Sequence, residues 1–293
     1  MDSINRRKFL RDGALGLGAI SLATLTKRPA FANPLGLPIG LELYTVRNEM
    51  AKDFDGTLQK VAAIGYQEVE LSGFYNKKAS EIRKSLSAAG LTSPSAHYQT
   101  PQFRTGLDER IEDARELGLK YMVCAFLQPQ ERKSIDDYRH LAEFFNKVGE
   151  QCHKAGLQFA YHAHNFEYTS YDGVVAFDEL LRLTDPKLFK IELDCYWMAR
   201  AGRDPADYLK RLPERFPLLH IKDMKPGHAP TTDLKEGADA FTEVGRGSID
   251  WKRIFTAAPA GTIKHYFVEQ DICERPPLES ARISYEYLHK LQV

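Results

Sequence analysis

Histidines and carboxylates recur in this sequence at the ends of short apolar runs. The pattern occurs six times, and its polar members are Glu70; His97; His162, His164 and Glu167; Glu192 and Asp194; His220, Lys222 and Asp223; and Glu269 and Asp271. A buried carboxylate pairs with a cation, takes up a proton or binds a metal, because an isolated buried charge is costly. If the apolar runs are strands whose ends meet, these residues predict a divalent metal ion. A ring of salt bridges using Lys222 and Arg200 is the alternative.

Eight short apolar segments alternate with amphipathic stretches from Pro38 to the end of the chain. The predicted strands are Ile39–Thr45, Glu68–Leu71, Ser93–His97, Met122–Phe126, Gln158–His162, Phe189–Asp194, Leu218–Ile221 and His265–Glu269. The predicted helices are Thr57–Ile64, Ala79–Ala89, Glu109–Leu117, Ile135–Ala155, Val174–Leu183, Pro205–Leu212, Ile249–Ala257 and Ser280–Leu291. Strands that alternate with helices of these lengths predict parallel strands joined by crossover helices.

Eight such units favour one closed (β/α)8 TIM barrel of the α/β class, formed by residues 33–293. No GxGxxG motif follows the first predicted strand, which argues against a dinucleotide-binding fold. In a TIM barrel the carboxyl ends of all strands meet on one face, so the polar residues at the strand ends should lie together there. The connection Lys225–Ser248 is unusually long, and such loops often carry function.

Residues 1–32 have the features of an export signal. Arg6-Arg7-Lys8 precedes an apolar stretch from Ala14 to Leu25, and Ala30-Phe31-Ala32 has the small-x-small pattern of a cleavage site. The paired arginines predict transit through the twin-arginine translocase to the periplasm. The apolar stretch is about a dozen residues, shorter than the roughly 20 that span a bilayer, so we expect no stable membrane anchor.

The charge balance bears on the partners of the exported chain. The whole sequence has 40 basic and 40 acidic residues; residues 1–32 contain six and two of them, which leaves 34 basic and 38 acidic residues and a net charge of −4. Nucleic acid is therefore not an expected partner, because phosphate backbones bind basic surfaces. The cysteines, Cys124, Cys152, Cys195 and Cys273, lie singly, and their spacing argues for no disulfide. A homo-oligomer is left open.

Several of these segments resemble the xylose isomerase-like barrel superfamily, often labelled sugar phosphate isomerases/epimerases. The likeness covers essentially all of the chain after residue 32. The segments that carry it are Tyr161-His162-Ala163-His164-Asn165-Phe166-Glu167, Glu192-Leu193-Asp194-Cys195-Tyr196-Trp197, His220-Ile221-Lys222-Asp223-Met224, Gly245-x-Gly247-x-Ile249-Asp250-Trp251 and Phe267-Val268-Glu269-Gln270-Asp271. The resemblance implies an enzyme that acts on a sugar or glycoside with one divalent metal ion. Carboxylate and imidazole ligands are compatible with Mn²⁺, Co²⁺, Mg²⁺ or Zn²⁺.

The resemblance also implies a ligand set. In ketose epimerases of this superfamily, a Glu, an Asp, a His and a Glu after strands five to eight hold the metal. The last three positions have direct matches here, in Asp194, His220 and Glu269. The first falls on Tyr161 or His162, and the nearest carboxylate is Glu167. We therefore predict Glu167 as the fourth ligand, with His162 and His164 as alternatives.

The predicted chemistry is proton transfer beside a carbonyl group. A metal held against a hydroxy-ketone polarises the carbonyl and stabilises an enediolate. Glu269 is the predicted base as well as a ligand, His162 or His164 the opposing acid or base, and Lys222 a further catalytic residue. Return of the proton gives isomerisation or epimerisation, our first expectation. Loss of a β-leaving group gives a lyase, and some relatives are said to act on 3-keto-glycosides in this way.

Four residues are predicted to bind the substrate: Glu70, His97, Glu167 and Trp197. Trp197 stands where the epimerases have a substrate-contacting His. Together with Phe74-Tyr75, it is expected to stack on a sugar ring at the pocket mouth. Burial of Trp197 in the core is the alternative.

The substrate is expected to carry no phosphate. Gly245-Arg246-Gly247-Ser248 has the composition of an anion cradle. However, its glycines also turn the chain into the following helix, where Ser248 is a plausible N-cap. Export would separate the protein from cytoplasmic sugar phosphates. Two other classes of protein are alternatives: a periplasmic sugar-binding protein without catalysis, and a metal-dependent DNA-repair endonuclease, which the net charge disfavours.

Overall fold

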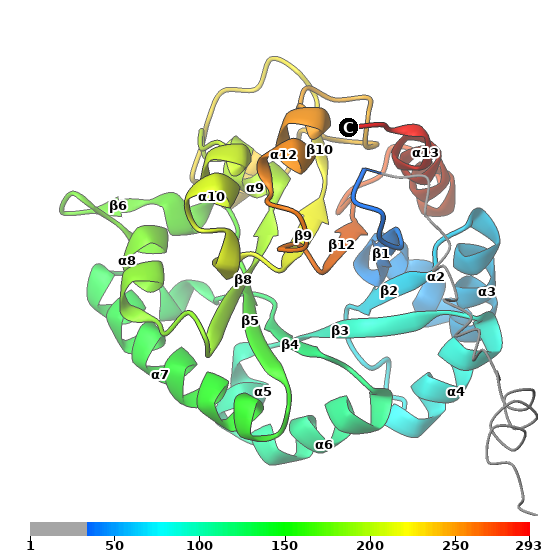
Figure 1. Ribbon diagram of the computed structural model, residues 1–293, viewed down its shortest axis with the longest axis horizontal. Helices are drawn as coiled ribbons and strands as arrows, with labels where there is room; N and C mark the ends of the chain where they lie inside the picture. The colour runs from blue at the N-terminus through cyan, green and yellow to red at the C-terminus, as the bar shows by residue number, and fades with distance from the viewer. Residues whose placement is uncertain (1–33) are drawn as a thin grey trace, which may run out of the picture. The chain divides into compact units, whose positions relative to one another are not determined.

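A computed structural model of the protein describes residues 34–293. The predicted export signal, residues 1–32, lies outside the described residues. Eight parallel strands close into a barrel in the order β1-β12-β9-β8-β5-β4-β3-β2, which confirms the predicted single TIM barrel (Figure 1). The barrel strands are β1 (Gly40–Glu42), β2 (Glu68–Leu71), β3 (Thr92–Tyr98), β4 (Tyr121–Cys124), β5 (Gln158–His162), β8 (Phe189–Asp194), β9 (Leu218–Ile221) and β12 (His265–Val268).

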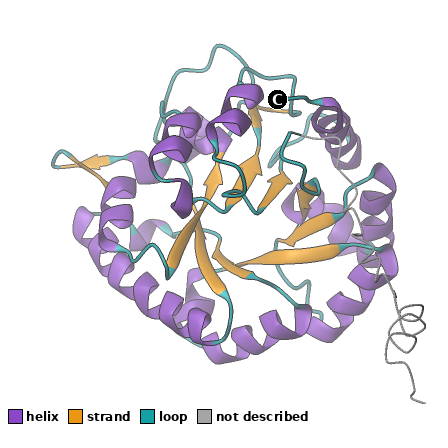
Figure 2. Cartoon of the chain, viewed as in Figure 1, coloured by secondary structure: helices purple, strands orange, loops and turns teal. Residues whose placement is uncertain are grey.

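Helices surround the barrel on its outer side (Figure 2). The α-helices are α2 (Arg47–Lys52), α3 (Phe54–Ile64), α4 (Ala79–Ala89), α5 (Thr100–Arg104), α6 (Leu107–Leu117), α7 (Ile135–Lys154), α8 (Ala176–Leu183), α9 (Cys195–Arg200), α10 (Pro205–Arg211), α11 (Leu234–Gly237), α12 (Trp251–Ala257) and α13 (Pro277–Lys290). Single 3₁₀ turns are η1 (Leu43–Val46), η2 (Pro129–Glu131), η3 (Phe166–Tyr168) and η4 (Pro213–Arg215). Within residues 34–293, no helix has the length and apolar character needed to cross a membrane.

The first predicted strand is shorter than expected. Ile39–Thr45 was predicted as one strand, but β1 ends at Glu42 and η1 follows. The Glu42 carboxylate accepts a hydrogen bond from the Tyr44 amide at 3.4 Å, which caps this turn. Leu43 is still fully buried, so the apolar run satisfies its burial in a turn rather than in a strand.

Two small hairpins were also missed. Val174–Val175 was predicted as the start of a helix, but it forms β7, which pairs with β6 (Ser170–Tyr171), and α8 begins at Ala176. The long connection Lys225–Ser248 contributes to a second hairpin, between β10 (Asp223–Met224) and β11 (Phe241–Thr242). β-branched residues favour an extended backbone, which explains why the helical pattern around Val174 was misleading.

The long connection is tied to the carboxyl end of the barrel by polar side chains. The Asn165 amide group donates to the carbonyls of Thr231 and Asp233 at 3.1 and 2.9 Å. The buried Arg200 guanidinium donates to the Glu236 carbonyl at 2.9 Å, and the Tyr196 hydroxyl to that of Gly237. These bonds satisfy backbone carbonyls in a segment with little secondary structure, and they hold α11 over the strand ends.

A small apolar cluster inside the barrel adjoins the polar strand ends. It consists of Val123, Ala160, Leu218 and Phe267. Phe267 is the register partner of His220, and Val123 that of His97. A side chain at Gly40 would overlap the Phe267 ring, so glycine is required there for close packing. The interior is therefore a filled core with a polar layer at one end, as in other TIM barrels.

Candidate metal centre and active site

Four side chains from four barrel strands converge at the carboxyl end, and we call them the mouth group: His162, Asp194, His220 and Glu269. One ligand atom from each lies within 4.8 Å of the other three, and all four residues are buried. His220 Nδ1 lies 2.6 Å from Glu269 Oε2 and 3.9 Å from Asp194 Oδ2. Two imidazole nitrogens and two carboxylates at this spacing fit a divalent metal ion.

The surroundings of His162 prepare it to be a metal ligand. Its Nδ1 lies 3.4 Å from the Ala125 carbonyl oxygen. Because a carbonyl oxygen can only accept a hydrogen bond, Nδ1 is the protonated nitrogen in this contact. Its Nε2 then presents a lone pair toward Asp194 Oδ2, 3.2 Å away. Burial, followed by the neighbouring His220, lowers the pKa of His162, which favours the neutral ring that metals bind.

Lys222 follows His220 by two residues on β9 and reaches the same carboxylates. Its Nζ lies 2.8 Å from Glu269 Oε2, 3.1 Å from Asp194 Oδ2 and 2.8 Å from Asp271 Oδ1. Burial opposes its charge, but these three carboxylates raise the pKa of Lys222 well above its usual value. Lys222 thus makes the salt bridges that were predicted for it as the alternative to a metal, beside residues that also fit a metal ion. Arg200 makes none with the strand-end carboxylates: it bonds to loop carbonyls and reaches Asp239 at 3.5 Å.

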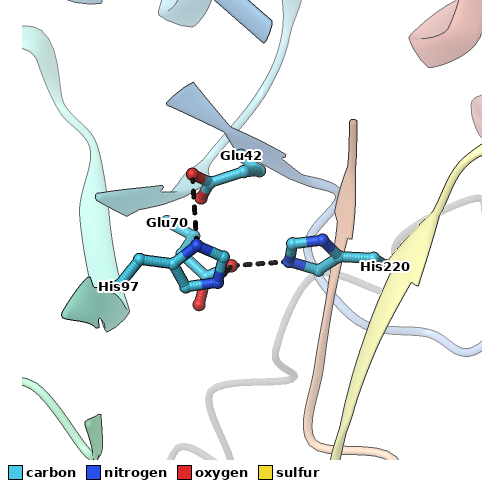
Figure 3. Close-up of side chains that lie close together, drawn as sticks. All are labelled: Glu42, Glu70, His97 and His220. Atoms are coloured by element: carbon cyan, nitrogen blue, oxygen red, sulfur yellow. Dashed lines mark hydrogen bonds and ion pairs between the residues drawn. The ribbon is translucent and has the colours of Figure 1, made fainter. Parts of the chain in front are cut away.

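A second set, the floor group, lies on the other side of His220 and contains Glu42, Glu70, His97 and Glu192. Figure 3 shows three of its members with His220. His220 Nε2 lies 2.6 Å from Glu70 Oε2 and 3.2 Å from Glu192 Oε2. His97 Nε2 lies 2.8 Å from Glu192 Oε2, and His97 Nδ1 3.8 Å from Glu42 Oε1. The three glutamates are fully buried.

Without a metal ion, bound protons help to neutralise the negative charge of the floor group. Burial raises the pKa of Glu42 well above its ordinary value. Burial works against a charged His97, yet Glu70 and Glu42 raise the pKa of this ring well above the usual value. His220 behaves in the same way beside Glu192 and Glu269. A metal at Nδ1 of His220 would replace one such proton and leave Nε2–H to donate to Glu70, an arrangement that fixes ring orientation in many metal sites.

Glu167, the predicted fourth ligand, lies outside both groups. Its carboxylate accepts hydrogen bonds from the Tyr161 hydroxyl and, at 2.8 Å, from the His164 amide. Burial raises the pKa of Glu167 to about 7. The place beside Asp194 and its partners is taken by His162, the alternative ligand, while Glu167 holds the turn that follows β5.

The polar groups open into one cavity of about 550 Å³. Six of the predicted site residues line it: His97, His162, His164, Trp197, Lys222 and Glu269. Glu70 and Glu167, both predicted to bind substrate, are fully buried and are not part of its lining. Phe74 and Tyr75 pack beside Tyr98 and Phe54 and do not line it either.

Two lining residues combine burial with an unpaired polar atom. His164 Nδ1 and Trp197 Nε1 have no hydrogen-bond partner among residues 34–293, although both atoms are buried. The His164 ring lies against Phe166 and 5.4 Å from Trp197, and burial lowers the pKa of His164 well below the usual value. Trp197 is only 2% exposed, so it is a core residue and a wall residue at once. A neutral imidazole and an indole ring thus form part of the cavity wall.

Sequence reasoning missed Glu42 and the rim residues Tyr44 and Arg47. Glu42 carried the same signal as Glu70, a carboxylate within an apolar run, but it lay in the middle of the predicted first strand. The early end of β1 is what brings Glu42 to the strand end. Tyr44 and Arg47 follow in η1 and α2, and both line the cavity.

Comparison with known proteins agrees with this geometry. The sequence profile of the xylose isomerase-like TIM barrel family matches residues 58–291. The chain belongs to this family.

Its relatives include sugar-modifying enzymes. An inosose dehydratase of Mesomycoplasma hyopneumoniae is 25% identical over 268 residues, which cover 81% of this chain and 88% of the relative. A sugar phosphate isomerase/epimerase structure from Parabacteroides distasonis superposes with a TM-score of 0.73 at 24% identity, covering 87% of this chain and 96% of that one. The IOLI protein, solved with a bound zinc atom, has a TM-score of 0.65 at 12% identity, covering 85% of this chain and 96% of that one. The two structures support the fold, and the dehydratase supports a related enzyme.

Proposed function

We propose that this protein is a divalent-metal-dependent lyase that removes water from a cyclic keto-sugar or keto-polyol. The observation that carries the proposal is the mouth group, which brings four metal-type ligands together and presents His162 and Glu269, with Lys222, to one open cavity. The curated inosose dehydratases, which align over four-fifths of the chain, support elimination. A dehydration of this kind breaks a C–H bond beside the carbonyl and a C–O bond at the next carbon, and it releases one water molecule.

His162, Asp194, His220 and Glu269 would hold the metal. When bound, it supplies a Lewis acid that lowers the cost of negative charge on the substrate carbonyl oxygen. The donor set fits such an ion, since both rings have a nitrogen facing the carboxylates and the carboxylate pair is shared with a single ammonium group.

The remaining cavity residues divide the proton transfers between them. Glu269, the base predicted from sequence, lines the cavity, and Lys222 Nζ, 2.8 Å away, can donate a proton to the departing oxygen. The neutral ring of His164 lines the same cavity and can form a hydrogen bond with a hydroxyl group. Trp197 offers its N–H and an apolar face, which suits a ring that has both C–H and O–H groups.

The loop after β9 supports a substrate without phosphate. The Asp223 carboxylate accepts the amides of Gly245, Gly247 and Ile249 at 2.8, 3.2 and 3.2 Å. It also accepts the indole N–H of Trp251 at 3.0 Å. An anion cradle needs free amides, and here a buried carboxylate already uses them. The proposed export of the chain through its N-terminal signal points to the same substrate class, and cell fractionation of the tagged full chain tests it.

Isomerisation or epimerisation is the second candidate. It requires the same abstraction of a proton, followed by its return to the same or the neighbouring carbon. His97 and His164 line the cavity and supply further acid–base groups for that return. The structural likeness to a sugar phosphate isomerase/epimerase is compatible with this chemistry.

One experiment separates the two reactions. The protein is loaded with Mn²⁺, Co²⁺ or Zn²⁺ and incubated in D₂O with inosose and with keto-hexoses, and the products are analysed by mass spectrometry and NMR. Elimination gives a product lighter by one water molecule. Epimerisation or isomerisation loses no water and gives an isomer of the substrate that carries deuterium bound to carbon.

The lyase proposal fails if metal-loaded protein gives deuterated isomers and no dehydrated product. A preference for phosphorylated over free keto-sugars, measured as kcat/KM, would contradict the substrate class.

A further inference from the structure

The rim of the cavity carries apolar side chains that water does not favour. Tyr44 is 42% exposed and Ile272 is 56% exposed, and both line the cavity. Within residues 34–293, the other exposed large apolar residue is Val293, at the chain end. A single exposed apolar residue is ordinary, but here Tyr44 and Ile272, the two that lie within the fold, line the same cavity. They follow β1 and β12, which are neighbours in the barrel.

Arg47 and Tyr44 form a flat platform at this rim. The Arg47 guanidinium lies 4.1 Å from the centre of the Tyr44 ring, and it donates one hydrogen bond to the Tyr44 carbonyl at 2.8 Å. A guanidinium has five N–H bonds, so donors remain for a ligand. The aromatic face next to these donors is suited to a sugar ring, whose C–H face is apolar and whose hydroxyl groups accept hydrogen bonds.

The rim is continuous with the mouth group. Asp271 Oδ1 is bonded to Lys222, which contacts Glu269, while Ile272 follows directly at the rim. Ser72 and Gln99 add polar groups to the same lining. The cavity of about 550 Å³ lies in the range of pockets that hold drug-sized ligands, which is more than one six-membered ring requires.

We propose that Tyr44, Arg47 and Ile272 form an outer subsite for the second sugar ring of a glycoside, whose first ring lies at the mouth group. This inference rests on the proposed function and narrows its substrate class to glycosides. The outer ring would cover Tyr44 and Ile272 and accept hydrogen bonds from Arg47, so it would contribute binding without taking part in the reaction.

Calorimetry on the Mn²⁺-loaded protein tests the subsite without turnover. The probes are cellobiose, maltose and glucose. We expect at least one disaccharide to bind about tenfold more tightly than glucose, a ratio that corresponds to about 1.4 kcal/mol. In Tyr44→Ala and Ile272→Ser the ratio should fall to between about one and three, because the apolar faces are removed. Tyr44→Phe should keep it, and Val293→Ser, an equally exposed apolar residue at the chain end, is the matched control.

Two results would overturn the subsite: equal affinity for glucose and both disaccharides in the unmodified protein, or a disaccharide preference that survives both substitutions. A melting curve for each variant shows whether it is folded, and Tyr44→Phe remains informative if Tyr44→Ala is not. If the preference behaves as expected but no keto-sugar is converted, the subsite stands and the proposed enzyme activity fails.

Discussion

The mouth group and the floor group are built from the same residue types, yet their surroundings differ. Both combine glutamate or aspartate with histidine. His220, a member of the mouth group, contacts Glu269 of that group through Nδ1 and Glu70 of the floor group through Nε2. His162 and Glu269 of the mouth group line the cavity, whereas only His97 does so in the floor group. Access to the cavity, and not composition, therefore separates residues that meet a substrate from residues that hold others in place.

His220 connects the two groups, so a change on either side should be felt at the metal. A ligand substitution removes a bond to the metal directly. A substitution in the floor group leaves the ligand present but less well oriented, which costs less.

Asp194→Asn should nearly abolish metal binding and activity. The substitution removes a carboxylate that lies within reach of His162, His220 and Lys222, while asparagine keeps an oxygen that can accept the hydrogen bond from the Trp197 amide at the start of α9. The loss of metal affinity should exceed the roughly 10–100-fold typical of a residue that only orients a ligand. Elemental analysis after dialysis gives the metal content. Full occupancy in this variant would show that the ion is held elsewhere, for instance in the floor group.

Separate substitutions of His162 and Glu167 should show which of the two residues is the fourth metal ligand. His162→Asn should lose most of the bound metal, because its Nε2 faces the Asp194 carboxylate. Glu167→Gln should keep the metal, since that carboxylate bonds to Tyr161 and the His164 amide instead. Both variants change one buried polar side chain of the β5 end, so each is the control for the other. Metal loss in Glu167→Gln alone would restore the ligand set predicted from sequence.

Glu70→Gln should lower metal affinity by roughly 10–100-fold, as expected for the partner of a metal-bound histidine. The Glu70 carboxylate lies 2.6 Å from His220 Nε2 and orients the ring. A metal-competition titration gives the affinity, and KM should change less than kcat at saturating metal. Sequence analysis predicted Glu70 as a substrate-binding residue. That role would appear as a raised KM with unchanged metal affinity.

Glu42→Gln is the control within the floor group. Its closest contact to a floor-group ring is 3.8 Å, from Oε1 to His97 Nδ1, so the effect on the metal should be smaller than that of Glu70→Gln. An equal loss in both variants would mean that the floor group acts as one unit.

Much of the fold could be predicted from the sequence because barrel strands and helices follow separate hydrophobic periods. The ends of β2, β5, β8 and β9 agree with the predicted strands to the residue. β1 could not be predicted to its end, because Leu43 is buried equally well in a turn as in a strand. The apolar pattern of a segment indicates only that the segment is buried. The hydrogen bond from the Tyr44 amide to the Glu42 carboxylate favours a turn there instead of a longer strand.

The sequence predicted which residues gather at the site, but not which of them belong to the mouth group and which to the floor group. Strand ends placed Asp194, His220 and Glu269 together because they share one face of the barrel. The sequence could not show that Glu70 lies below His220, since depth within the barrel depends on register and strand tilt. It also could not show that Glu167 turns toward Tyr161, because a loop residue has no periodic signal.

Glu179 of α8, a buried carboxylate whose two arginine partners face solvent, provides the smallest expected effect and a reference for the mouth and floor groups. The Glu179 carboxylate accepts hydrogen bonds from Arg182 Nε at 2.7 Å and Arg139 Nε at 2.9 Å. These arginines, Arg182 before Arg139, lower the pKa of Glu179 from 4.5 to about 2. Both arginine side chains are largely exposed, at 64% and 46%, so solvent screens the pair.

Glu179→Gln should therefore lower the Tm by only about 1–4 °C near neutral pH and leave metal content unchanged. Because folding lowers the pKa of Glu179, its stabilisation is complete above about pH 4.5 and is lost as the pH falls toward about 2. The Tm difference between the two proteins should shrink over that interval. Thermal unfolding at a series of pH values measures it, with the exposed Glu112→Gln as control. A difference that grows on acidification would show that another group carries the stability, and a loss of metal would tie this surface pair to the barrel mouth.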